Sequence, residues 1–149
     1  MTQLIRTALL EVPPSVAYAV VVDVMSYPEF VPGCKSVSVL ETHAAGLVAE
    51  VAVAGKGISE SFVTTNQHRL DEMVLMSLRE GPFECLEGQW SFTALGDIGC
   101  RIDLRIEYIP KGVLARLLST FADMMANKMV DAFSARIVAE HRLRAAADG

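Results

Sequence analysis

The stretch RIDLRIEYIPKGVLARLLSTFADMMANKMVDAFSARI, residues 101–137, changes its hydrophobic period in the middle. Before Pro110, apolar residues at the even positions alternate with mostly charged residues at the odd positions, as in a β-strand with one buried face. After Gly112, apolar residues recur at steps of three and four, which is the period of an amphipathic helix. The stretch therefore predicts a half-buried strand followed by a helix with one apolar side.

The helix predicted after Gly112 is unusually long. No further Pro or Gly occurs before Gly149, so the pattern extends to about residue 147, roughly three times the length of an average helix. The face predicted to be buried carries Leu114, Leu117, Leu118, Phe121, Met124, Met125, Met129, Phe133 and Ile137. Because a sheet with one wet face needs a cover on its other face, we expect this helix to lie across the sheet.

The residues before this helix keep a period of two back to residue 35. Turn sequences such as HAAG, AGKG and EGPFE divide them into further strands. We expect these strands near 35–42, 46–54, 58–69, 72–80, 86–95 and 100–109. Because the turns are short, successive strands are predicted to pair antiparallel, as a meander.

The N-terminal part predicts one more strand and two short helices. Residues 2–12 form the strand, because they are rich in apolar and β-branched side chains and lack Gly and Pro. Pro14 suits the first turn of a helix that runs to about Met25, and a second short helix, PEFV, begins at Pro28. The whole chain is thus predicted to be one α+β domain, residues 1–149, with a curved antiparallel sheet of about seven strands gripping the long C-terminal helix.

The composition disfavours several classes of function. A net charge of −5 and a pI of about 5.1 argue against nucleic-acid binding, DNA included, which depends on clustered Lys and Arg. Cys34, Cys85 and Cys100 are odd in number and widely spaced, which favours free thiols in the cytoplasm. The longest apolar run, VAYAVVV at 16–22, is too short to span a bilayer.

The sequence gives little support to catalysis or metal binding. The histidines have no ligand spacing, and no HExxH, GxSxG or phosphate-binding glycine loop occurs. They are His43, His68 and His141. Four glutamates near predicted turns are candidates for an acid–base pair, although such residues are mostly solvated. They are Glu60, Glu80, Glu84 and Glu87.

The hydrophobic share of 52% indicates either a generous core or an interior built to meet an apolar molecule. A sheet curved around one helix leaves a space that bulky side chains fill or line. Met124, Met125 and Met129 place flexible, polarisable groups at this interface, as suits a site that repacks around a guest. Plain core packing explains the same residues.

Three motifs together resemble one family. They are SYPEFVPGCKSVSVLE at 26–41, LREGPFECLEGQWSF at 78–92 and MVDAFSARI at 129–137. They resemble the coenzyme Q-binding proteins and bacterial ribosome-association toxins, a branch of the START-like, polyketide cyclase/dehydrase superfamily. The resemblance implies a helix-grip fold with a hydrophobic tunnel between sheet and C-terminal helix. One departure is Gly33, where many relatives have Trp.

The resemblance also implies a function. It is the non-catalytic binding of ubiquinone, with no required cofactor, in support of respiratory electron transport or quinone biosynthesis. The residues expected to line the tunnel and its mouth are Tyr27, Phe30, Val31, Pro32, Lys35, Val37, Phe62, Trp90, Phe92, Leu104, Ile106, Leu117, Phe121, Met124, Met125, Met129 and Phe133. A prenyl tail supplies most of the affinity, since each buried CH₂ contributes about 0.8 kcal/mol.

Some of these residues have alternative interpretations. Lys35 is the candidate donor to a quinone carbonyl at the mouth, or a solvated lysine at a strand start. Tyr27 and Phe30 either gate the mouth or hold the short helix on the sheet. Trp90 and Phe92 share one face and line the interior or fill the core.

Two other functions stay open. One is a ribosome-association toxin that binds the large ribosomal subunit and blocks subunit joining, for which the basic helix end at Arg136, Arg142 and Arg144 is the candidate surface. The acidic net charge weighs against it. The weaker alternative is a small-molecule cyclase. The location implied throughout is the cytoplasm, with transient peripheral contact at the inner membrane as one option.

Overall fold

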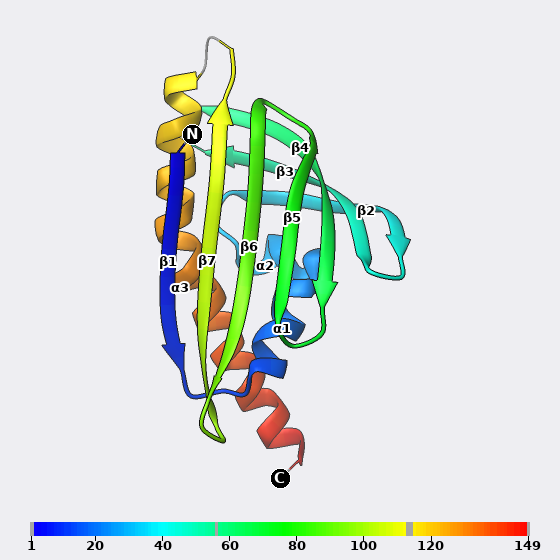
Figure 1. Ribbon diagram of the computed structural model, residues 1–149, viewed down its shortest axis with the longest axis vertical. Coiled ribbons are helices and arrows are strands. Elements are labelled where there is room, and N and C mark those ends of the chain that lie inside the picture. The colour runs from blue at the N-terminus through cyan, green and yellow to red at the C-terminus, as the bar shows by residue number, and fades with distance from the viewer. Residues whose placement is uncertain (1, 56, 113–114, 149) are drawn as a thin grey trace.

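The strands form one antiparallel sheet that curves around a long helix (Figure 1). We analysed a computed structural model that describes residues 2–55, 57–112 and 115–148. The elements in chain order are β1 (Thr2–Leu10), α1 (Pro14–Val22), a 3₁₀ turn η1 (Val24–Ser26), α2 (Tyr27–Phe30), β2 (Cys34–His43), β3 (Gly46–Gly55), β4 (Ile58–Arg69), β5 (Met73–Glu80), β6 (Phe83–Leu95), β7 (Gly99–Pro110) and α3 (Ala115–Asp148). The predicted α+β helix-grip architecture is therefore confirmed.

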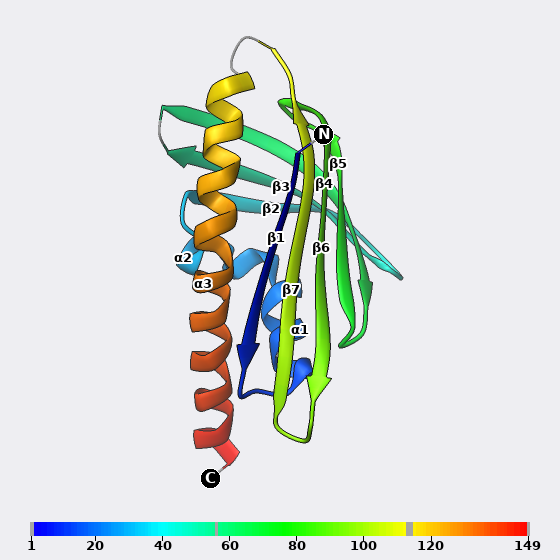
Figure 2. The ribbon, with the colours of Figure 1, turned by 60° about the vertical axis from the view of Figure 1, so that its left-hand side comes forward.

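The sheet has the strand order β1–β7–β6–β5–β4–β3–β2, and every neighbouring pair is antiparallel. Strands β2 to β7 follow one another as the predicted meander, and β1 joins the far edge by pairing with β7. Figure 2 shows α3 running almost the full height of the molecule along one side of the sheet. The short helices α1 and α2 pack between the sheet and the C-terminal half of α3.

The predicted boundaries hold to within a few residues, with two physical corrections. Helix α1 ends at Val22 rather than at Met25, because Asp23 leaves the helical conformation, with φ −83° and ψ 70°. Strand β6 begins at Phe83 rather than at residue 86, because Phe83 pairs with Pro110 across a β-bulge. Leu114, which the helical pattern includes, lies outside the described residues.

An aromatic cluster fixes α3 on the sheet. The ring of Phe133 lies 4.8 Å from that of Trp90 on β6, 5.2 Å from that of Tyr27 and 4.9 Å from that of Phe30, all measured between centroids. Its contacts with Tyr27 and Phe30 are edge-to-face, the arrangement that aromatic quadrupoles favour. The guanidinium of Arg136 covers the Phe30 ring at 5.0 Å. One side chain of α3 thereby joins three elements.

The central position of Phe133 predicts a large loss of stability on truncation. Phe133 is 1% exposed, so Phe133→Ala removes about six carbons from a packed site and leaves a cavity, at a cost of about 3–5 kcal/mol. Chemical denaturation in urea measures the change in the free energy of unfolding. Leu143→Ala is the control on the same helix, because Leu143 is 67% exposed and we expect a change within about 0.5 kcal/mol. Equal effects of the two substitutions would contradict the anchoring role of Phe133.

Candidate functional site

A cavity of about 190 Å³ lies between the concave face of the sheet and α3. Apolar side chains from β3, β4, β6 and α3 make up most of its wall. An engineered dry cavity of about 150 Å³ is large enough to bind benzene. The space between this sheet and helix is therefore large enough for one ring-sized apolar group without any rearrangement.

The structure brings about half of the predicted lining residues to this cavity. Those on its wall are Tyr27, Val31, Phe62, Trp90, Ile106, Phe121, Met125, Met129 and Phe133. They come from α2, β4, β6, β7 and α3, so elements far apart in the chain converge there. Their contact with a ligand stays a prediction.

Other predicted residues lie elsewhere. Phe92 and Leu104 are buried in the core, where Phe92 packs edge-to-face on Tyr18 of α1 at 6.1 Å. Leu117 and Met124 are partly buried and pack against the same core from the flanks of α3. Phe30 and Pro32 are also absent from the wall, because the Phe30 ring packs on Phe133 and Arg136, and Pro32 occupies the turn before β2.

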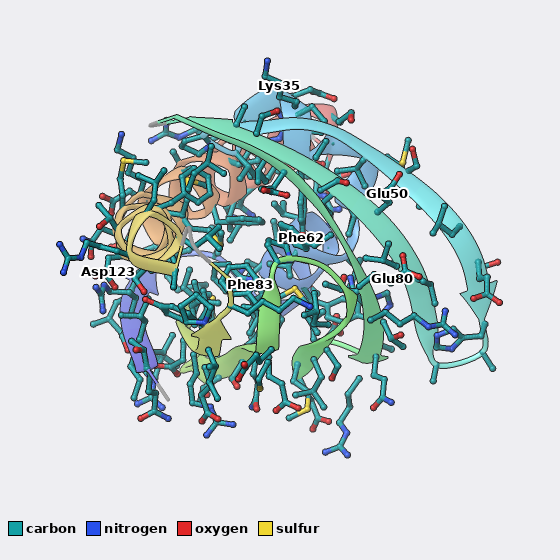
Figure 3. All side chains as sticks on the ribbon, turned by 90° about the horizontal axis from the view of Figure 1, so that it is seen from above. Lys35, Glu50, Phe62, Glu80, Phe83 and Asp123 are labelled. Atoms are coloured by element: carbon teal, nitrogen blue, oxygen red, sulfur yellow. The ribbon has the colours of Figure 1, made fainter. Side chains whose placement is uncertain are left out.

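Lys35 and Val37, both expected to line the tunnel or its mouth, do not lie on the cavity wall. The pairing of β2 with β3 shifts between Cys34 and Ser36, so Lys35 occupies a β-bulge. In a regular strand, residues three positions apart point to opposite faces. Cys34 and Val37 are three positions apart, but Cys34 lines the cavity and Val37 is buried in a second small cluster. Lys35 is exposed and points away from the interior (Figure 3).

The backbone conformation and the close contacts at position 33 account for a glycine there. Its φ of +79° is left-handed, a conformation that side chains rarely adopt, and its carbonyl accepts a hydrogen bond from the Ala54 amide at 2.9 Å. An added Cβ would lie 3.1 Å from the Ala54 carbonyl oxygen and 3.4 Å from the Met125 sulfur. Glycine therefore lets the start of β2 approach both β3 and the cavity wall of α3.

Strand β4 contributes a row of cavity residues that the sequence reasoning mostly missed. Glu60, Phe62, Thr64 and Asn66 alternate along β4 and all line the cavity. The period of two, counted from Phe62, was the signal that would have found them. This period is not visible as a hydrophobic pattern, because three of the four side chains are polar. Other missed wall residues are Val24, Cys34, Ala49, Val51, Val53, Ile58, Met76, Pro82, Phe83, Leu86, Gly88, Leu118 and Ala122.

The polar groups in the wall are mostly kept neutral or paired. Thr64 and Asn66 are 7% and 4% exposed, and the Thr64 hydroxyl donates to the Asn66 side-chain carbonyl at 2.8 Å. Burial raises the pKa of the Tyr27 hydroxyl, which donates to the Val21 carbonyl, and also raises the pKa of the Cys34 thiol. A raised pKa favours the protonated thiol of Cys34, which is the less reactive form.

The wall offers few groups for chemistry. Glu60 is the carboxylate on the cavity wall among the described residues, and Glu80, Glu84 and Glu87 are exposed. None of the three histidines lines the cavity. Burial lowers the pKa of His68, whose Nε2 is buried without a hydrogen-bond partner beyond the deep end of the β4 row. Within residues 2–55, 57–112 and 115–148, no cluster of His, Cys, Asp or Glu could hold a metal ion.

A glycine opens the middle of the sheet. Asn66 pairs with Met76, Met76 with Gly88, and Gly88 with Ile106, so these residues form one row across four strands of the concave face. Gly88 is buried and has no side chain, so the flexible end of Met76 borders the cavity at the centre of this row. An added Cβ would lie 2.8 Å from the Met76 methyl carbon, the flexible end of that side chain.

Comparison with known families and proteins finds one matching family and several similar toxins. Residues 10–134 match the family described as polyketide cyclase/dehydrase and lipid transport. The chain is 40% identical over 138 residues to the persistence and stress-resistance toxin PasT of Escherichia coli, covering 91% of this chain and 87% of the relative. It is 39% identical to the ribosome association toxin RatA of Vibrio cholerae, covering 91% of this chain and 95% of the relative.

Solved structures share the same fold. The Zhui aromatase/cyclase from Streptomyces sp. R1128 superposes with a TM-score of 0.86 at 16% identity, over 97% of both chains. An 18 kDa protein from Caulobacter crescentus has a TM-score of 0.74 at 29% identity, over 92% of this chain and 96% of that one. Among the described residues, no helix is both long and apolar enough to traverse a bilayer.

Gly88→Val is predicted to fill the cavity from the sheet side. The valine side chain enters the space beside Met76, so we expect the fluorescent probe 1-anilinonaphthalene-8-sulfonate to bind about tenfold more weakly, or not at all. Valine suits a strand better than glycine, so the melting temperature should not fall. The control is Glu87→Val on the exposed face of the same strand, which should bind the probe like the unmodified protein. Unchanged binding by Gly88→Val would show that the probe does not use this cavity.

Proposed function

Because the chain belongs to the polyketide cyclase/dehydrase and lipid transport family, we propose that it binds a hydrophobic ligand in the cavity between the sheet and α3, without transforming it. The observation that carries this proposal is the cavity itself. A domain that needed only a stable core would gain by filling 190 Å³ of apolar space, since voids cost packing energy. The space is kept open by Gly88 and bordered by flexible methionines.

We propose a prenylated quinone such as ubiquinone as the ligand. A quinone ring is the size of group that the cavity accommodates as it stands, and its carbonyls only accept hydrogen bonds. The prenyl tail needs further space, which Met125 and Met129 on α3 and Met76 on β5 provide by changing rotamers. Each CH₂ that becomes buried in this way contributes about 0.8 kcal/mol to binding.

The proposed entrance lies at the end of the cavity farthest from the aromatic cluster. There the β3–β4 hairpin, the start of β6 and the N-terminal part of α3 converge. Ile58, Phe62, Phe83 and Phe121 line the cavity at this end. Figure 3, which views the molecule from that end, shows Phe62 and Phe83 on the inner side of the curved sheet. In this proposal Phe62 and Phe83 lie at the mouth, where the sequence had suggested Lys35.

The absence of catalysis is part of the proposal and has its own support. The most similar relatives named above are toxins, and the aromatase/cyclase at 16% identity shares the fold alone. Glu60 would be the acid or base of a cyclase, because it is the wall carboxylate. A turnover that Glu60→Gln abolishes would therefore favour the cyclase alternative.

Organic extraction tests the ligand directly. Protein purified from bacterial cells that make ubiquinone should release a prenylated quinone, identified by mass spectrometry, in amounts approaching one per chain. Trp90 is the single tryptophan and lines the cavity, so added quinone should also quench its fluorescence. Lys35→Ala should load as well as the unmodified protein, because Lys35 lies outside the cavity. Clean extracts together with unquenched Trp90 would refute quinone binding.

Association with the large ribosomal subunit is a second candidate, favoured by one observation. The relatives at 39–40% identity are named as toxins, most of them as ribosome association toxins, and this chain covers 87–95% of their length. The candidate surface is the basic end of α3. There Arg136 pairs with Glu29 at 3.2 Å and Arg144 with Glu140 at 3.2 Å, which reduces the positive charge, while Arg142 is exposed.

Co-sedimentation tests the second candidate. If α3 contacts ribosomal RNA, the protein should pellet with purified large subunits, and the double variant Arg142→Glu/Arg144→Glu should lose most of this binding, more so at low salt. The control is Arg79→Glu, which makes the same kind of charge change on β5, where Arg79 pairs with Glu41. Equal losses in both variants, or no pelleting at all, would argue against this surface.

A further inference from the structure

Two polar side chains are almost fully buried against the cavity. Thr64 and Asn66 follow each other on the inward face of β4, at 7% and 4% exposure. Both belong to the cavity wall. They lie toward the deep end, because β4 runs from Ile58 near the proposed entrance to Arg69 at the opposite end of the sheet. A polar pair at this depth is costly unless its hydrogen bonds are satisfied.

The pair has two hydrogen-bond donors more than its own contact uses. The Thr64 hydroxyl donates to the Asn66 side-chain carbonyl at 2.8 Å, which leaves the Asn66 amide NH₂ as a donor. No other hydrogen bond of either side chain occurs within the described ranges 2–55, 57–112 and 115–148. If the amide is turned round, one N–H of its NH₂ donates to the Thr64 oxygen, and the second N–H and the hydroxyl proton are free. In both arrangements a donor faces the cavity.

The surroundings of this donor are apolar and uncharged. Asn66 lies in the cross-strand row with Met76 and Gly88, where the flexible end of Met76 lies over Gly88. The described wall residues include no Lys or Arg. Glu60 lies six residues before Asn66 on β4, which is about 20 Å along an extended strand. A carboxylate or phosphate would thus find no counter-charge at this point, whereas a neutral carbonyl needs only the donor.

We propose that the Thr64–Asn66 pair binds the neutral carbonyl-type acceptor of the cavity's ligand, which therefore enters with its acceptor end first. This inference rests on the proposed hydrophobic-ligand function and adds the orientation and the chemical class. The ligand is an apolar molecule that carries an uncharged acceptor at its buried end, such as a quinone, ketone or ester. Its apolar remainder points toward Phe62, Phe83 and the entrance, so fatty acids bound through their carboxylate are excluded.

A matched pair of probes separates the acceptor from the apolar contacts. 2-Methyl-1,4-naphthoquinone and 2-methylnaphthalene have nearly the same shape and differ in two carbonyl oxygens. Their affinities are measured by displacement of 1-anilinonaphthalene-8-sulfonate from the unmodified protein and from Thr64→Val/Asn66→Leu. Replacing both partners by apolar groups of similar shape leaves no buried polar group behind, so the fold is preserved. Thr65→Val is the control, the same substitution on the adjacent residue, which faces the other side of the sheet.

The ratio of the two affinities decides the outcome. We expect the double variant to bind the quinone about tenfold more weakly and the hydrocarbon equally well or better, while Thr65→Val changes neither. If the ratio is unchanged although both probes bind, the acceptor does not use this pair, and the proposed ligand binding stands without the inference. If neither probe binds the unmodified protein, the proposed function fails and the inference with it.

A second measurement needs no variant. The infrared carbonyl band of 2-methyl-1,4-naphthoquinone bound to the unmodified protein should split, with one component lowered in frequency by a hydrogen bond. Labelling of the quinone oxygens with ¹⁸O assigns the band. Carbonyl bands at the frequencies found in an alkane solvent would show that the bound ring receives no hydrogen bond, and would overturn the proposal even if the double variant failed to fold.

Discussion

The packing of Phe133 between the sheet and the short helices sets the geometry of the rest of the molecule. Its ring fills the space between Trp90 on β6 and the aromatic rings of α2, so the C-terminal half of α3 is held close to β6 and α2. On the N-terminal side, α3 presents Phe121, Met125 and Met129 to the curved sheet without closing the gap. One helix thereby serves as a core element over half its length and as a cavity wall over the other half.

Residues on β4 and β6 also help to form the cavity between the sheet and α3. A glycine at position 88 and short polar side chains at positions 64 and 66 stand where larger apolar residues would give better packing. Each choice costs stability on its own, through a lost contact or a buried polar group. Their occurrence together around one space is better explained by a guest molecule than by the needs of the fold. In the proposed complex, Thr64 and Asn66 would supply a directional contact to the ligand.

The fold was predictable from the sequence because periodicity reports which side of an element is buried, and long uninterrupted patterns leave little choice of element. The helix after Gly112 and the alternation of β7 are examples. The cavity was only partly predictable. The bulge at Lys35 changes which residues of β2 point inward. A bulge is an irregularity of strand pairing, so the alternation of apolar and polar residues in the sequence does not reveal it. Thr64 and Asn66 were missed because a search for an apolar tunnel passes over polar side chains, although burial is decided by register.

The two candidate functions use separate parts of α3. A ligand in the cavity would contact the helix up to Phe133, whereas the exposed Arg142 and Arg144 lie beyond the aromatic cluster, to which Arg136 belongs through its contact with Phe30. Phe133 is held by rings on three sides, and Met125 and Met129 are flexible side chains on the cavity wall that can change rotamer around a ligand. Occupancy of the cavity should therefore leave the basic end unmoved. On this geometry, hydrophobic-ligand binding and ribosome association are compatible in one chain, because neither requires the surface that the other uses.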